Sequence, residues 1–522
     1  MKNLPIGIQT FSKLIEGDYL YIDKTQLISD LISEGGGYFF LSRPRRFGKS
    51  LLITTLAEIF KGKKELFTGL WIYDKIGWDS YPVIHMDFST IDYESPDRLK
   101  ESIKRFLDDT ASSFGMALDK KGSFKENFVE LIKKLGSEKG VVILIDEYDK
   151  PLIDFLESGK IDTAKEIRLV LKNFYSAIKG SDAYLRFVFI TGVSKFSKVS
   201  VFSDLNNLMD ITLSEKYSTL LGYTEIELLN YFSPYMDVMK EKLGIDGGAL
   251  REKIREWYNG YSWDGENFVY NPFSILNLFN VKGFENFWFS TGTPGFLIDL
   301  VKPMQSEVIE FENMGVQSYI FDTFDFDNLE IAALLFQTGY LTIKKIIINE
   351  NTLSKTFYLS YPNREVRQSF LSHLFGTVTE KDLRTSSRIL EKVNRYVERD
   401  DIDGFIREIE SLFASIPYQI FIENKEAYYH TVIYLLLRLN GGVVKCEEAT
   451  NTGRIDGVLE TKNKIYIMEF KMGKALEAMD QIKRKKYFEK YLGMGKEIIL
   501  IGIGFSEEKR NVGDYLVETM SV

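Results

Sequence analysis

The sequence has almost no cysteine and little histidine, and both shortages limit the chemistry available to it. Cys446 is the single cysteine of the 522 residues, which excludes an intrachain disulfide and favours a reducing compartment such as the cytoplasm. With only His85, His373 and His430, the chain offers no zinc cluster of cysteine and histidine ligands. Each histidine is interpreted as structural, and His430 is nearest to the acidic segment close to the C-terminus.

Long apolar runs and an excess of basic residues are also missing. No stretch is apolar for the roughly 18 residues that cross a bilayer, and the first residues lack the apolar core of a signal peptide, so we expect a cytoplasmic protein without membrane contact. The net charge of -9 excludes a global basic field, and DNA or RNA would need a local basic patch. A length of 522 residues predicts three or four domains.

A nucleotide site is predicted near the start of the chain. Residues 43–50 (RPRRFGKS) join a short apolar strand to an apolar helix, which is the setting of a phosphate-binding P-loop. Lys49 would reach the β- and γ-phosphates, and Ser50 would ligate Mg²⁺. Arg43 stands where the usual pattern has glycine, so the loop is non-standard. The residues predicted to bind ATP are Arg46, Phe47, Gly48, Lys49, Ser50 and Leu51.

A second segment supports that prediction. Residues 141–145 (VVILI) form a predicted buried strand that ends in Asp146 and Glu147. Asp146 would hold Mg²⁺, and Glu147 would polarise the attacking water. The structural alternative, in which both carboxylates only cap a strand, is disfavoured by the P-loop upstream.

The remaining strands predict the fold of this part. Residues 82–88 and 185–190 complete a doubly wound parallel α/β sheet together with the helical segments between them. After the second of these strands, Thr191 or Ser194 could sense the γ-phosphate. A simple turn at Gly192 explains the same residues equally well, and both interpretations stay open.

These motifs resemble those of the bacterial AAA-ATPase-like family. The resemblance covers roughly residues 4–215, in the same order. It also accounts for Arg43, because that family similarly has RPRRFGKS. Members commonly carry a C-terminal nuclease-like domain of the PD-(D/E)XK type. The segments that carry the resemblance are residues 21–25 (YIDKT), 43–50 (RPRRFGKS), 145–151 (IDEYDKP), 190–197 (ITGVSKFS) and 205–208 (LNNL).

The middle of the chain turns helical after the predicted sheet. Helices are expected at residues 223–232, 236–243 and 250–257, in a segment that resembles the helical lid of the same family. A plain helical connector is the alternative, and both interpretations stay open. A helix at residues 329–339, followed by strands at 340–348 and 356–361, suggests a winged-helix element. Winged helices can bind DNA, but this segment is not basic enough to favour DNA, and we interpret it as a packing module. The predicted domains are residues 1–215 (P-loop ATPase), 216–300 (lid), 301–368 (winged-helix-like) and 369–522 (nuclease-like).

An acidic hairpin is the most informative feature of the last domain. If Glu460 pairs with Ile465, Asp456 lies opposite Glu469 on one face, and Lys471 projects from the same face two residues later. Two carboxylates and a lysine on apolar strands suit a divalent cation and a polarised water. The structural alternative is an internal salt-bridge network in a degenerate domain.

The order of elements around this hairpin resembles the PD-(D/E)XK nuclease fold over roughly residues 370–510. The resemblance implies that Asp456 and Glu469 bind Mg²⁺, that Lys471 is catalytic and that Gln481 is an accessory residue. Glu426 could supply a third acidic group, and Lys485 lies one turn after Gln481 in a helix expected at residues 475–491. A basic run could bind phosphates or be a solvated helix face; it comprises Lys483, Arg484, Lys485, Lys486 and Lys490.

Together the two sites lead to a first hypothesis: an ATP-binding and ATP-hydrolysing protein whose P-loop module regulates or powers a Mg²⁺-dependent nuclease acting on DNA or RNA. The alternative is an ATP-driven signalling switch whose nuclease-like domain is inactive and serves binding or oligomerisation. A third interpretation is a nucleotide-binding scaffold without turnover. The sequence leaves open homo-oligomerisation and the choice between DNA and RNA.

Overall fold

The chain forms two compact units, and the two predicted sites lie in different ones. The computed structural model describes residues 1–34, 37–157, 159–195, 202, 205, 207–288, 311–322, 324–325, 328–416, 425–439, 443–449 and 454–520. The first unit comprises Met1–Phe296 and Asn313–Val366, and the second comprises Leu297–Glu312 and Arg367–Val522. Among the described residues, no helix combines the length and apolar character needed to span a membrane.

A five-stranded sheet in the order β2-β3-β4-β1-β5 forms the centre of the first unit. Its strands are β1 (Tyr38–Ser42), β2 (Val83–Asp87), β3 (Val141–Asp146), β4 (Leu185–Gly192) and β5 (Met209–Asp210). All neighbouring strands are parallel, so their carboxyl ends meet at one edge. Because β4 lies between β1 and β3, the loop that follows β4 lies between the P-loop and Asp146. The predicted parallel α/β sheet is confirmed.

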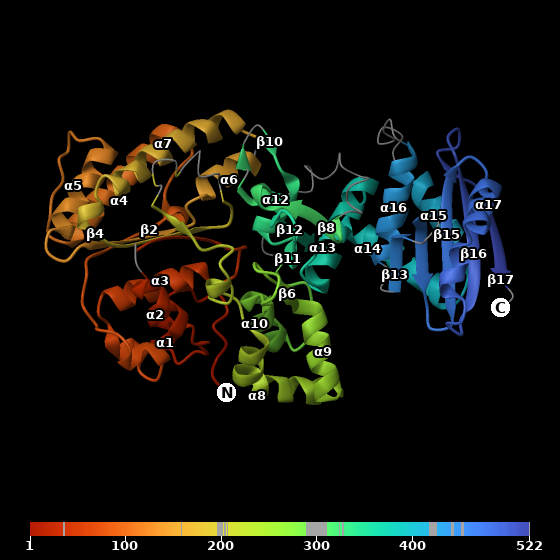
Figure 1. Ribbon diagram of the computed structural model, residues 1–522, viewed down its shortest axis with the longest axis horizontal. Coiled ribbons are helices and arrows are strands. Elements are labelled where there is room, and N and C mark those ends of the chain that lie inside the picture. The colour runs from red at the N-terminus through yellow and green to blue at the C-terminus, as the bar shows by residue number, and fades with distance from the viewer. Residues whose placement is uncertain are drawn as a thin grey trace. The chain divides into compact units, whose positions relative to one another are not determined.

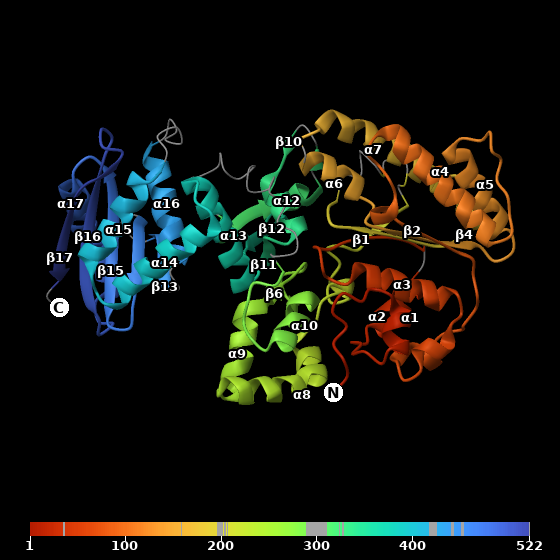
Figure 2. The same cartoon turned by 180° about the vertical axis from the view of Figure 1, so that it is seen from behind.

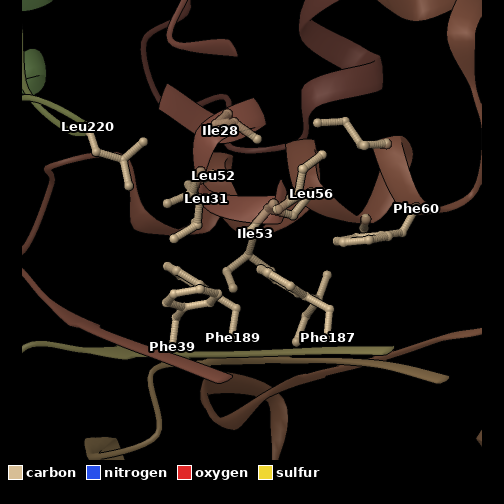
Figure 3. Close-up of a cluster of buried hydrophobic side chains, with 14 of the residues drawn as sticks. Ile28, Leu31, Phe39, Leu52, Ile53, Leu56, Phe60, Phe187, Phe189 and Leu220 are labelled. Atoms are coloured by element: carbon tan, nitrogen blue, oxygen red, sulfur yellow. The ribbon is translucent and has the colours of Figure 1, made fainter. Parts of the chain in front are cut away.

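Helices cover both faces of this sheet (Figures 1 and 2). One face carries α1 (Phe11–Glu16), α2 (Thr25–Ser33) and α3 (Lys49–Phe60), and the other carries α4 (Pro96–Ser113), α5 (Phe124–Gly136), α6 (Lys150–Glu157) and α7 (Ile161–Lys179). Figure 3 shows Leu52, Ile53 and Leu56 of α3 facing Phe39 of β1 and Phe189 of β4 in a buried cluster. This apolar contact fixes the helix that begins at the P-loop against the strands that carry the other site residues.

The segment predicted to be a lid, called the lid below, contains α8 (Glu225–Leu243), α9 (Gly247–Tyr258), α10 (Pro272–Val281) and a small hairpin of β6 (Asn259–Tyr261) and β7 (Val269–Tyr270). Whether it closes over nucleotide stays a prediction. The prediction of two helices at residues 223–232 and 236–243 is wrong, because α8 continues through Pro234. Phe232 and Met239 lie two turns apart, one on each side of the proline, and both side chains are buried in the core of the lid. This burial, with a capping box at the helix start, offsets the hydrogen bond that Pro234 removes.

The rest of the first unit contains the predicted helix followed by a β-hairpin. The elements are β8 (Met314–Gln317), β9 (Phe324–Asp325), β10 (Asn328–Leu329), α12 (Ile331–Thr338), β11 (Thr342–Ile348) and β12 (Lys355–Ser360). The hairpin strands pair antiparallel, and β8 extends them to a three-stranded sheet that the sequence did not predict.

The second unit contains a mixed five-stranded sheet in the order β13-β14-β15-β16-β17. Its strands are β13 (Val443–Ala449), β14 (Arg454–Glu460), β15 (Lys464–Met472), β16 (Glu497–Ser506) and β17 (Asn511–Met520). Its helices are α13 (Arg364–Thr379), whose first three residues belong to the first unit, α14 (Leu383–Glu398), α15 (Ile402–Ala414), α16 (Lys425–Leu439) and α17 (Ala475–Lys485). Figures 1 and 2 show α15 and α16 on one face of the sheet and α17 on the other. The strands β14, β15 and β16 occur where they were predicted, whereas β13 and β17 were not predicted.

The helix expected at residues 475–491 is shorter than predicted. Helix α17 ends at Lys485, and Lys486 adopts a left-handed conformation with φ of 52°. A short 3₁₀ turn, Tyr487–Tyr491, follows. The change of direction buries Tyr487 and Tyr491 in the apolar cluster beneath α17, which a continuous helix would not bury together.

A buried carboxylate joins three parts of the first unit. Glu365, in the first turn of α13, has no exposed surface and accepts hydrogen bonds from the Trp288 backbone N–H at 2.7 Å and the Ser274 hydroxyl at 2.8 Å. Burial raises the pKa of Glu365 to about 7, although the hydrogen bonds from Trp288 and Ser274 oppose the shift. Ser274 belongs to the lid helix α10, so the charge state of Glu365 bears on how firmly the lid is held.

We predict that Glu365→Gln makes the first unit less sensitive to pH. Because the folded pKa lies above the unfolded value, the folded wild type binds more protons, and its stability falls as the pH rises from about 4.5 through 7, by about 3 kcal/mol in total. Glutamine keeps an acceptor for Trp288 and a donor for Ser274 without the charge. Thermal unfolding between pH 5 and 9 should therefore show the variant more stable at high pH. A parallel loss in wild type and variant would contradict this, and exposed Glu266→Gln is the control.

Candidate functional site

The P-loop has the geometry that phosphate binding requires. Gly48 adopts a left-handed conformation with φ of 93° and precedes α3. In the described part of the chain, its two sequence neighbours aside, no atom lies within 4 Å of the position that a Cβ would occupy there. The backbone can therefore approach a ligand closely at the helix N-terminus. The Lys49 ammonium donates to the Arg43 carbonyl at 2.9 Å and the Pro44 carbonyl at 3.0 Å, which holds it across the mouth of the loop.

Acidic residues face this lysine from the end of β3. Asp146 is buried and accepts a hydrogen bond from the Ser50 hydroxyl, so the two predicted Mg²⁺ ligands already lie together. Burial raises the pKa of Asp146 and of Glu147, and Lys49 opposes both shifts. Burial likewise lowers the pKa of Lys49, against the attraction of Asp146 and Glu147. These groups thus compensate one another's charge in a partly desolvated site.

A cavity of about 380 Å³ opens beside these groups. Its P-loop lining residues are Arg45, Arg46, Gly48, Lys49, Ser50 and Leu51, and its other lining residues are Pro5, Gly7, Ile8, Gln9, Glu147, Asp149, Lys150, Ile153, Val193, Tyr223, Pro272, Phe273 and Leu276. Arg46 places its guanidinium 5.0 Å from the centre of the Phe273 ring. Phe47 is the one predicted nucleotide-binding residue that does not line this cavity. Its side chain is buried against Tyr261 and Trp263. A contact between Phe47 and nucleotide would have to come from its backbone.

The side chains of the two predicted phosphate sensors, Thr191 and Ser194, form hydrogen bonds within the protein. Thr191 is buried and donates to the Leu41 carbonyl at 2.7 Å, and Ser194 donates its hydroxyl to Asp149 at 2.6 Å. Asp149 also accepts from the Val193 and Ser194 backbone N–H groups, so it fixes the loop that follows β4. A sensing role for Thr191 or Ser194 stays a prediction.

Sequence reasoning missed several residues of this cavity. Asp149 stands two residues after Glu147 in the quoted IDEYDKP segment, but nothing in the sequence showed that its side chain would bend back to the β4 loop. Pro5 and Ile8 come from the N-terminal segment, and Tyr223 and Phe273 come from the lid. Such residues are distant in sequence and carry no motif of their own.

The acidic hairpin has the predicted register. Glu460 pairs with Ile465 and Gly457 with Met468, and the same register continued by one residue sets Asp456 opposite Glu469. The Asp456 carboxylate accepts the Phe470 backbone N–H at 2.8 Å, just beyond the last paired residues. The strand backbone therefore orients Asp456 as well as carrying it.

Glu469 is the most deeply buried group of this site. Its side chain has no exposed surface, and within the described residues its Oε2 atom accepts no hydrogen bond. Burial, and then the neighbouring Asp456, raise the pKa of Glu469 to about 8, while Lys471 lowers it. A buried carboxylate beside a second one is costly without a cation, and a divalent cation would remove that cost.

Three polar side chains surround the carboxylates. The Lys471 ammonium lies 3.7 Å from Glu469 Oε1, and Gln481 of α17 donates its amide N–H to the same oxygen. His430 of α16 places Nε2 3.9 Å from Asp456 Oδ2. The structure thus brings together Asp456, Glu469, Lys471 and Gln481, and it adds His430, which the sequence placed nearby without a role.

The remaining predicted accessory residues are less informative. The side chain of Glu426 lies outside the described residues, so a third acidic group is not placed. Lys485 is partly exposed in the last turn of α17. In the basic run, Lys483 forms an ion pair with Glu518 at 2.6 Å and Lys486 with Glu489 at 3.1 Å, which reduces the charge available to a nucleic acid.

The two carboxylates of this site suit Mg²⁺ better than a metal that requires three or more protein ligands. Within the parts of the chain that are described, no group of three or more histidine, cysteine, aspartate or glutamate side chains could hold a metal ion. Mg²⁺ is commonly held by one or two carboxylates, with water and substrate phosphate as further ligands. Asp456 and Glu469 meet that requirement, with the oxygen of Glu469 that accepts no hydrogen bond as the natural ligand.

Comparison with known proteins gives both units a family. A family described as predicted AAA-ATPase matches residues 5–202, and one described as PD-(D/E)XK nuclease superfamily matches residues 424–515. The chain is 39% identical over 533 residues to "Uncharacterized protein in vnfD 5'region" of Azotobacter chroococcum mcd 1, and the match covers 99% of each chain. No solved structure matches the chain. The protein belongs to the family of AAA-ATPase-like proteins that carry a C-terminal domain of the PD-(D/E)XK nuclease superfamily.

Proposed function

We propose that this protein hydrolyses ATP in its first unit and that the nucleotide state regulates a Mg²⁺-dependent nuclease in its second unit. The observation that carries the nuclease is the meeting of Asp456 and Glu469 on neighbouring strands, with Lys471 beside them. The cavity that contains Lys49 and Glu147 supports the ATPase. DNA or RNA is the proposed substrate of the second site.

In the second unit, each side chain has a separate task. Mg²⁺, when bound by Asp456 and Glu469, would acidify a water molecule and neutralise charge on the scissile phosphate. The Lys471 ammonium orients that water and stabilises negative charge on the phosphate oxygens. Gln481 holds Glu469 in place through its amide, and the Phe470 backbone N–H does the same for Asp456.

In the first unit, the proposed reaction is transfer of the γ-phosphoryl group of ATP to water. Lys49 and the N-terminus of α3 would bind the phosphates, and Ser50 and Asp146, which lie together, would hold Mg²⁺. Glu147 positions the attacking water and accepts its proton, a task that its raised pKa favours. Helix α10 contributes Phe273 and Leu276 to the same cavity, so nucleotide binding bears directly on the lid.

A second candidate function has a specific observation in its favour. Lys471 and Gln481 both contact Glu469, so the charge and one oxygen of this carboxylate already have partners within the protein. This arrangement also suits an ATP-driven signalling switch whose nuclease-like domain only binds a partner or another copy. The two functions differ in whether phosphodiester bonds are cleaved.

For the nuclease, Lys471→Ala should reduce Mg²⁺-dependent cleavage by about 10² or more, because charge on the phosphate then lacks its nearest ammonium group. Asp456→Asn should do the same by weakening metal binding. Cleavage of labelled single- and double-stranded DNA and RNA, with and without ATP, measures both effects and the regulation. Lys474→Ala removes an exposed lysine three residues away and is the matched control. Wild-type cleavage rates in Lys471→Ala would end the assigned role.

For the metal site, Glu469→Gln should raise the unfolding midpoint without Mg²⁺ at neutral pH and above, because glutamine removes the free-energy cost of burying a carboxyl whose pKa is raised to about 8. It should also abolish the stabilisation by Mg²⁺, which in wild type reaches about 2.7 kcal/mol when Mg²⁺ is 100 times its Kd. Thermal unfolding with a Mg²⁺ titration measures this. Glu147→Gln, the same substitution in the other unit, should keep the response of the second unit. Equal stabilisation of wild type and Glu469→Gln would place the metal elsewhere.

For the ATPase, Lys49→Ala should abolish ATP binding, whereas Glu147→Gln should bind ATP and hydrolyse it about 10²–10⁴-fold more slowly. Equilibrium binding and phosphate release measure the two steps separately. If wild type binds ATP without releasing phosphate, the first unit is a nucleotide-binding scaffold and not an ATPase.

A further inference from the structure

Side chains of the P-loop pack against aromatic residues of the lid. The Arg43 guanidinium lies over the Trp263 ring, 3.8 Å from its centre. The Phe47 ring meets Tyr261 and Trp263 edge-on, at centroid distances of 4.8 and 5.4 Å. Tyr261 ends β6 of the lid hairpin and Trp263 follows it. Two bulky side chains of the loop are therefore embedded in one aromatic segment.

Two further contacts hold the residues between them. The Trp288 indole N–H donates to the Arg45 carbonyl at 3.0 Å. Gly339 ends α12 so close to the loop that a Cβ there would lie 2.7 Å from the Pro44 Cβ. Each residue from Arg43 to Phe47 thus contacts the lid, Trp288 or Gly339 at the end of α12, with Arg46 against Phe273.

Arg43 does not serve as a phosphate ligand in this arrangement. Its side chain is buried, donates to the Ser42 and Thr212 carbonyls at 2.9 Å each, and does not line the nucleotide cavity. Removing a guanidinium from water is costly unless hydrogen bonds and a ring face replace the water. Here both Nη atoms donate to backbone carbonyls and the Trp263 ring covers the guanidinium, whereas Nε has no hydrogen-bond partner among the described residues. The side chain is consequently a strong tie between the P-loop and Trp263.

We propose that the contact between Arg43 and Trp263, the Arg43–Trp263 pair, sets the geometry of the P-loop, so that Arg43 is a positioning residue for nucleotide binding. The link to the ligand is the Arg43 carbonyl, which holds the Lys49 ammonium at 2.9 Å. Displacing Arg43 moves this carbonyl and with it the amine that binds the β- and γ-phosphates. The inference rests on the ATP site proposed above.

The alternative is that Arg43 merely replaces the usual glycine and stabilises the fold. The two accounts differ for a folded variant. A stabilising role alone lowers the unfolding temperature and leaves nucleotide affinity unchanged well below it. The positioning role changes affinity at a temperature where the variant is fully folded, and it makes the effects of substitutions at residues 43 and 263 non-additive.

The experiment measures Mg·ADP affinity of the full chain by calorimetry, with KM and kcat for ATP alongside. Trp263→Leu removes the ring face and should weaken ADP binding at least tenfold, about 1.4 kcal/mol. Trp263→Phe keeps a ring face and should stay within about threefold. Arg43→Lys and Arg43→Gly should match Trp263→Leu, and Arg43→Lys combined with Trp263→Leu should be no weaker than either single variant. Tyr358→Leu is the control, because it removes a ring 4.5 Å from Lys345 on the β11–β12 hairpin.

The outcomes separate this inference from the proposed function. Wild-type affinity in folded Trp263→Leu, or in Arg43→Gly, would overturn the positioning role and leave the ATP site intact. Absence of ADP binding by wild type would overturn both. If Trp263→Leu does not fold, Arg43→Lys and Trp263→Phe still decide, since the pair requires the first to lose affinity and the second to keep it.

Discussion

The antiparallel register of β14 and β15 is the constraint on which the nuclease assignment depends. Pairing of Glu460 with Ile465 sets Asp456 opposite Glu469, and a shift by one residue would send them to opposite faces. The sheet buries Glu469 fully, next to a second carboxylate. Such a pair is expensive in a protein interior, and a divalent cation is the partner that both removes the cost and creates chemistry.

In the nucleotide site, too, a sheet brings buried charged side chains together, but here the strands are parallel. Parallel strands bring the P-loop, Asp146 and Glu147 to one edge of the sheet, and burial sets Lys49 against these carboxylates. The bulky residues before Gly48 add a second layer, because each contacts a segment outside the sheet. In the proposed account, nucleotide binding and lid position are linked through the backbone that holds Lys49. Glu365 accepts a hydrogen bond from Ser274 of the same lid segment.

The sequence predicted those parts of the fold that local patterns encode. The P-loop, the strand before Asp146 and the register of the acidic hairpin all follow from apolar periodicity and short motifs, and the structure has them. Helix α8 and the early end of α17 could not be predicted, since the burial of Met239 and Tyr487 outweighs the local signals of Pro234 and a continuous helical pattern. The contribution of Phe273 depends on a segment far from the P-loop in the chain, which no spacing reveals. His430 is near the acidic hairpin in the sequence, but the sequence does not show that its side chain turns toward Asp456.

The central claim is that Asp456 and Glu469 hold a divalent cation. Crystals of the full chain grown with Mn²⁺, which substitutes for Mg²⁺ and scatters anomalously, test it most directly. We predict an anomalous peak within about 2.3 Å of oxygen atoms of both carboxylates, a slightly longer distance than the 2.0–2.1 Å of Mg²⁺. A well-ordered pair of carboxylates without any peak, with Lys471 bound directly to Glu469, would contradict the account and leave an internal ion pair in its place.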